Sequence, residues 1–241
     1  MDFLFSLEGM AETLQSANTI KQGPGDIKFA RKMDKWRTAS PSPVDALNKR
    51  ILAIKTNISK MQVLALKIPG PPKLDYVAYG QAVTVQAVDP TVMTNAISAG
   101  NRIATVVLAA GGRPGSASKI VNVLRDAQQA IPVAGDKGSK SYTLAFPTSP
   151  MQWPTAKWFN NSKGITEGHI AIINQALAKL ESIVRQVALI IRAPNSNSMT
   201  EMCDRVAFVN AASVVTKLVY DFTTQYIKNL RELAKVQVSK K

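Results

Sequence analysis

The chain contains one histidine, His169, and one cysteine, Cys203, the side chains best suited to base and nucleophile chemistry near neutral pH. A thiol nucleophile needs a base within hydrogen-bond reach and a third group that orients the base. The two residues fall in different predicted helices, so they meet only if these helices pack in one particular register. We therefore expect a partly exposed histidine, a buried thiol and a protein that is not an enzyme.

Metal-dependent chemistry is not indicated either. No group of histidine, cysteine and carboxylate residues has the spacing of metal ligands, and the acidic residues are scattered along the chain. An enzyme that acts on nucleic acid would need clustered carboxylates to hold its metal ions. The sequence therefore predicts neither a metal site nor a cofactor.

A glycine-rich stretch from Gly111 to Lys119 has the composition of a phosphate-binding loop. A P-loop needs a second glycine followed by lysine and then serine or threonine, but Ser116 or Ala117 occupies that glycine position. A weaker role stays open, in which amides at the start of the next helix, with Arg113 and Lys119, hold a phosphate. We favour the plainer interpretation, a connection between two helices.

The chain is strongly basic, with 30 lysine and arginine residues against 16 acidic ones and a net charge of +14. Nucleic acid, an anionic membrane surface and an acidic protein are all possible partners of such a chain. From Lys21 to Lys73 twelve cations face only three acids, whereas ordinary helix surfaces mix the signs. The candidate RNA-binding residues of this stretch are Lys28, Arg31, Lys32, Lys35, Trp36, Arg37, Lys49 and Arg50.

Trp36 has two interpretations, because its ring either stacks on a base or anchors the basic stretch on the core. A second candidate patch combines aromatic residues with lysines in a stretch rich in proline and glycine. Rings stack on any base and lysines follow the phosphates, so this combination is typical of single-strand binding. Its candidate RNA-binding residues are Lys137, Lys140, Tyr142, Lys157, Trp158 and Lys163.

The hydrophobic spacing predicts a mainly α protein in one or two lobes, with little or no β-structure between residues 76 and 146. Residues 1–22 form an amphipathic N-terminal arm, 23–69 a basic helical module, and 70–241 a helical core with an irregular basic-aromatic loop over 131–164. Helix starts are expected at Ser42-Pro43, Asp89-Pro90 and Ser198, the last with a capping box to Glu201. Residues 91–110 are either a helix, which we prefer, or a buried strand. The arm carries the candidate oligomerisation residues. Phe3, Leu7, Met10 and Leu14 lie on one helical face, and Leu4 lies beside them.

These features favour a non-enzymatic structural protein that coats single-stranded RNA without sequence preference and self-assembles, as a viral nucleocapsid or coat protein does. The expected partners are RNA and further copies of the chain. The alternative is a matrix-type assembly protein that binds anionic lipid at a membrane surface. No apolar run is long enough for a transmembrane helix, and the expected location is the cytoplasm or a virion.

Overall fold

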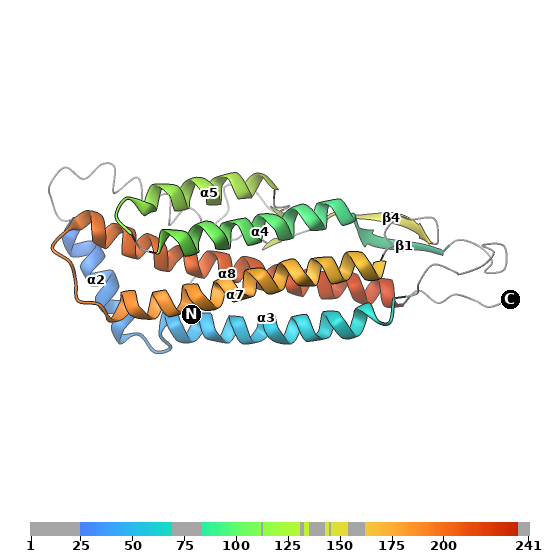
Figure 1. Cartoon of the computed structure of the whole chain (residues 1–241), viewed down its shortest axis with the longest axis horizontal. Coiled ribbons are helices and arrows are strands. Elements are labelled where there is room, and N and C mark those ends of the chain that lie inside the picture. Colours follow the sequence, from blue (N-terminus) through green and yellow to red (C-terminus); the bar gives the residue numbers. More distant parts are fainter. Residues whose placement is uncertain are drawn as a thin grey trace.

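The structure is a computed structural model that describes residues 25–68, 83–111, 113–130, 133–134, 143–144, 146–153 and 162–235. Long helices lie side by side along one axis, α2 crosses one end of them, and two strands lie at the other end (Figure 1). The expected mainly α fold is confirmed. The helices are α2 (Gly25–Thr38), α3 (Pro43–Ala65), α4 (Pro90–Ala110), α5 (Ser116–Ala130), α7 (Ser162–Arg192) and α8 (Met199–Ala234).

Capping residues begin three of these helices where the sequence predicts. Ser42 caps α3 in a full capping box, because its hydroxyl accepts from the Asp45 amide while the Asp45 carboxylate accepts from the Ser42 amide. Asp89 caps α4, which settles residues 91–110 as helix. At α8 only half of the predicted box forms: Ser198 accepts from the Glu201 amide, but the Glu201 carboxylate accepts from the Ser196 hydroxyl and pairs with Arg205.

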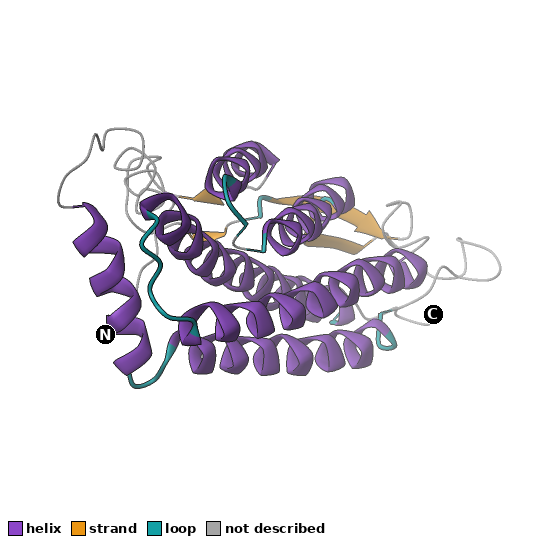
Figure 2. Cartoon of the chain, turned by 60° about the vertical axis from the view of Figure 1, so that its left-hand side comes forward, coloured by secondary structure: helices purple, strands orange, loops and turns teal. Residues whose placement is uncertain are grey.

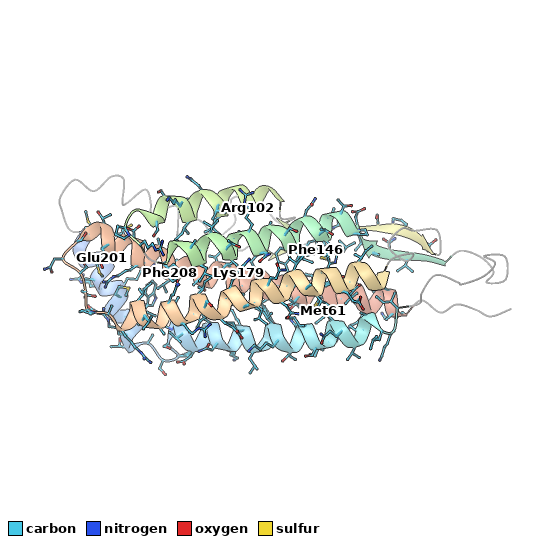
Figure 3. The ribbon with its side chains drawn as sticks, in the orientation of Figure 1. Met61, Arg102, Phe146, Lys179, Glu201 and Phe208 are labelled. Carbon is cyan, nitrogen blue, oxygen red and sulfur yellow. The ribbon has the colours of Figure 1, made fainter. Side chains whose placement is uncertain are left out.

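α8 lies at the centre of the fold, among α3, α4, α5 and α7 (Figures 1 and 2). Its spacing predicts a single apolar face, yet Met202 to Ala212 are buried on almost every side of the helix. Phe208 and Tyr226 are among the largest fully buried side chains, and Phe146 packs a ring on Phe222 with centroids 5.7 Å apart (Figure 3 labels Phe146 and Phe208). A central helix contacts partners all round, so its core-facing positions need not follow one face.

The amino-terminal basic segment shares this core. Met33 of α2 and Ile54 and Met61 of α3 belong to the same cluster of buried residues as Phe208 and Leu230 of α8. Buried residues on both sides of the predicted division between residues 69 and 70 therefore belong to one cluster. The predicted division rests on the sequence Pro69-Gly70-Pro71-Pro72, which favours the end of a helix.

The β-structure is small. β1 (Val83–Val88) pairs antiparallel with β4 (Thr148–Trp153), and β2 (Val133–Ala134) pairs with β3 (Thr143–Leu144). β4 was not predicted, because Pro150 interrupts its sequence; a two-stranded ribbon tolerates proline, since each strand has a free edge. The predicted irregular loop over 131–164 thus contains β2, β3, β4 and the start of α7. Its residues 131–132, 135–142, 145 and 154–161 lie outside the described part.

Candidate polyanion-binding surface

His169 lies inside the bundle, with 3% of its surface exposed, and the expectation of a partly exposed histidine is wrong. Its Nε2 is 2.7 Å from the Thr94 hydroxyl, and its Nδ1 is 2.8 Å from the Tyr226 hydroxyl. Thr94 donates its one hydroxyl hydrogen to the Pro90 carbonyl, which leaves Nε2 as the donor to Thr94. Nδ1 then accepts from the Tyr226 hydroxyl, whose other neighbour, the Thr166 hydroxyl, is farther away at 3.4 Å. The geometry therefore favours a neutral ring.

Cys203 is buried, as expected, but lies far from His169. His169 contacts Tyr226, and Cys203 precedes Tyr226 by 23 residues on the same helix. At 1.5 Å per residue this separation is about 35 Å. The two residues therefore form no dyad, and burial together with Asp204 raises the pKa of the Cys203 thiol. Among the described residues no three histidine, cysteine or acidic side chains are grouped as metal ligands.

The buried His169 predicts a pH-dependent stability, because burial lowers its pKa from 6.5 to about 4. Between these values the unfolded chain binds a proton that the folded chain excludes, so stability is complete above pH 6.5 and falls as the pH drops. We expect urea unfolding at pH 7 and pH 5 to show a loss of about 2 kcal/mol from this residue. His169→Gln cannot titrate and should lose correspondingly less, and an equal loss in both proteins would contradict the assignment.

The glycine-rich connection between α4 and α5 is a structural turn. Gly111 ends α4 in the left-handed conformation, with φ of 53°. The carboxylate of Asp204, buried in α8, accepts hydrogen bonds of 2.8 Å from the amides of Gly115 and Ala117 at the start of α5. These amides already hold an anion, so the phosphate role suggested for them is wrong. Arg113 and Lys119 are exposed beside this turn.

Two residues of the predicted basic cluster in α2 have structural roles. Trp36 is 5% exposed, so its ring anchors α2 on the core, and the Lys32 ammonium lies 5.3 Å from the ring centroid. Arg37 donates to the carbonyls of Ile191 and Ala193 and thereby caps the end of α7. Neither Trp36 nor Arg37 is available to RNA in this arrangement.

The rest of that cluster divides by exposure. Arg31 and Lys35 are exposed on α2, whereas the side chain of Lys28 lies outside the described residues. Arg50 is half-buried and donates to the Ser213 hydroxyl at 3.0 Å, and burial lowers the pKa of its guanidinium. Arg50 therefore joins α3 to α8, and Lys49 beside it is exposed.

Contacts of α3 with α8 fix how the two helices align. Arg50 contacts Ser213, and seven residues later the Asn57 amide donates to the Thr224 hydroxyl at 3.2 Å. Residue numbers rise together in the two helices, so they run parallel (Figure 1). Lys60 follows Asn57 by three residues and Lys228 follows Thr224 by four, which places both lysines about one helical turn beyond this contact.

Exposed cations lie along both helices, before and after this contact. Lys49 and Lys60 of α3 are eleven residues apart, close to three full turns, so they share one face, and Lys67 follows in the turn that ends the helix. On α8, Lys217 follows Ser213 by four residues, and the later cations follow Thr224 by four, seven and eleven residues. These spacings are close to whole turns, so the α8 cations lie on the face of Ser213 and Thr224. We call this set the basic strip: Lys49, Lys60, Lys67, Lys217, Lys228, Arg231 and Lys235.

Few acids accompany the basic strip. Asp221 pairs with Lys217 and Glu232 pairs with Lys235, so seven cations less two acids leave a net charge of +5. Lys49, Lys60, Lys67, Lys228 and Arg231 form no ion pair within the described ranges. By contrast, Lys179 donates to Asn101 and Thr105 between α7 and α4 (Figure 3). The strip is thus a surface whose positive charge is largely uncompensated.

Sequence reasoning names Lys49 of this strip but misses its extension along α8. A pattern in the sequence does indicate this extension. Thr224, Lys228, Arg231 and Lys235 are spaced by four, three and four residues, which places the three cations on one helical face. The residues of the second candidate patch lie outside the described part of the chain: Lys137, Lys140, Tyr142, Lys157, Trp158 and the side chain of Lys163. The oligomerisation residues Phe3, Leu4, Leu7, Met10 and Leu14 also lie outside them.

Comparison with other proteins identifies no relative. No family model, curated protein or solved structure matches this chain. In the described part of the chain no helix is long and apolar enough to cross a membrane.

Proposed function

We propose that this protein binds single-stranded RNA without sequence preference and coats it as a non-enzymatic, self-assembling structural protein, as a coat or nucleocapsid protein does. The observation that carries the proposal is the basic strip, with a net charge of +5 on two parallel helices. Lysine and arginine side chains that neutralise phosphates release counterions, and this gain does not depend on base sequence. Exposed Arg31 and Lys35 of α2 add a second basic surface.

The length of the strip suits a strand of RNA better than a small anion. Lys49 of α3 and Lys67, two residues past the end of that helix, are 18 residues apart, about 27 Å at helical rise. Lys217 of α8 and Lys235, the residue that ends it, are separated by the same number of residues. Cations spread along such a line can follow successive phosphates of an extended strand. Aromatic residues for base stacking are expected from the second predicted patch.

The experiment that tests this proposal is purification of the full chain with and without nuclease, followed by absorbance ratio and electron microscopy. We expect the untreated protein to carry RNA in rings or filaments and the nuclease-treated protein to lose them. Anionic liposomes provide the other arm, because a matrix-type protein would be drawn to them through the same charge. Protein that is free of RNA and binds only the liposomes would overturn the proposal.

A further inference from the structure

The outer face of α3 carries an apolar stripe that no described element covers. We call Leu52, Thr56, Ser59, Val63 and Leu66 the α3 stripe; their spacings of four, three, four and three residues place them on one face. Leu52, Val63 and Leu66 are 65%, 55% and 76% exposed. Such spacing is typical of a helix that packs against another helix rather than of a solvated surface.

The polar members of the α3 stripe do not interrupt it. The Thr56 hydroxyl donates to the Leu52 carbonyl at 3.0 Å, and the Ser59 hydroxyl donates to the Lys55 carbonyl at 3.2 Å. Both hydroxyls are thus satisfied within α3, so a partner helix can cover them without leaving a donor unpaired. α3 lies at the edge of the bundle, with α7 and α8 on its inner side (Figures 1 and 2).

Basic residues border the stripe on both sides. Lys49, Lys60 and Lys67 lie along the side next to α8, and Lys55 lies on the side next to α7, where it pairs with Glu181. A helix that covers the stripe would therefore be favoured by acidic residues beside its apolar face.

The first twenty residues of this chain have that composition. Their acids are Asp2, Glu8 and Glu12, and no lysine or arginine occurs before Lys21. On a helix, Asp2 and Glu8 would fall on the two sides of the apolar face and Glu12 opposite it. The apolar face predicted for them, from Phe3 to Leu14, would be about 17 Å long as a helix, and Leu52 to Leu66 span about 21 Å. Charge and length therefore both match the stripe.

We propose that residues 2–18 of a second copy lie along the α3 stripe as an amphipathic helix, burying Phe3, Leu7, Met10 and Leu14 against it. This inference rests on the self-assembly in the proposed function and names the surface that receives the arm. Each copy offers one arm and one stripe at different places, so copies can join head-to-tail into a ring or filament. Such a chain of copies presents successive basic strips to one strand of RNA.

Disulfide trapping of full-length, nuclease-treated protein tests the contact without RNA. Met10→Cys and Ser59→Cys place thiols near the middle of the arm and of the stripe, and the native Cys203 is buried. Mixing the two single variants under mild oxidation should give a covalent dimer. Met10→Cys mixed with Lys119→Cys, an exposed position on α5, is the control and should give little dimer. Equal amounts of covalent dimer in both mixtures would overturn the proposal. A Met10→Cys/Ser59→Cys double variant that forms its disulfide only within one chain, with no covalent oligomer, would also overturn it.

Polar substitution of the stripe gives an independent readout. The variant Leu52→Asn/Val63→Asn/Leu66→Asn should weaken self-association in light scattering by at least about tenfold. Leu189→Asn, which changes a 68% exposed leucine of α7, is the matched control and should assemble normally. Affinity for an RNA too short to span two copies should stay within about twofold, which separates this failure from loss of RNA binding. Unchanged assembly, or a loss of binding to anionic liposomes with assembly intact, would contradict the inference.

Discussion

Asp204→Ala is expected to lower the free energy of unfolding by about 4 kcal/mol, because it leaves two amides without a partner. The Asp204 carboxylate is 2% exposed and accepts 2.8 Å hydrogen bonds from Gly115 and Ala117. Asp204 thus caps the N-terminus of α5 from the neighbouring helix α8. Its negative charge also interacts favourably with the positive end of the α5 dipole. Urea unfolding followed by circular dichroism measures the change.

Asp204→Asn is the control for this prediction, since it keeps the shape and one acceptor oxygen but loses the charge. Its loss should be about half that of Asp204→Ala. A loss below about 1 kcal/mol for Asp204→Ala would mean that α5 does not depend on this contact. That result would also reopen the amides at the start of α5 as an anion site.

Removing four cations of the basic strip is expected to weaken binding of single-stranded RNA by about 100-fold near 0.1 M salt. The dependence of log affinity on log salt should also become shallower by about 3, because each lost phosphate contact removes about 0.7. Fluorescence anisotropy of a labelled oligouridine at several salt concentrations measures both quantities. The variant replaces with alanine the strip residues Lys60, Lys67, Lys228 and Arg231.

A control variant with the same net charge as the strip variant distinguishes the effect of the strip from the effect of total charge. It replaces exposed cations on α4, α5 and α7, so its total charge falls equally while the strip stays intact. We expect its affinity to fall by less than about fivefold, because exposed charges beyond a Debye length are largely screened. An equal loss of RNA affinity in the two variants would show that the strip binds RNA no better than other exposed cations do. The control residues are Arg102, Lys119, Arg185 and Arg192.

Local signals in the sequence predict the helices well. Ser42, Asp89 and Ser198 each begin a helix because a short polar side chain accepts from amides that no helical partner reaches. In α3 the sequence also places apolar residues three or four positions apart, a spacing that predicts one buried face, and Leu47, Ile51, Ile54, Ile58 and Met61 are all buried. Such features depend on residues within a few positions of one another, and sequence reveals them directly.

Features that join distant residues are not predicted. Asp204 lies in the second turn of α8, and nothing nearby in the sequence shows that it would cap α5. The sequence predicts Arg37 to be a phosphate ligand, because the carbonyl groups at the end of α7 that it binds lie more than 150 residues away in the chain. The basic strip likewise needs the parallel alignment of α3 and α8. In each case a charged side chain acquires its role only when two helices pack.

Lysine acetylation of the wild-type protein, with and without oligouridine, tests most directly whether the strip binds RNA. Mass spectrometry reports the reactivity of each lysine, and every strip lysine named above is exposed before RNA is added. We predict that RNA protects Lys49, Lys60, Lys67 and Lys228 several-fold and leaves Lys119 unchanged. Protection confined to other lysines, with the four strip lysines as reactive as before, would contradict the account.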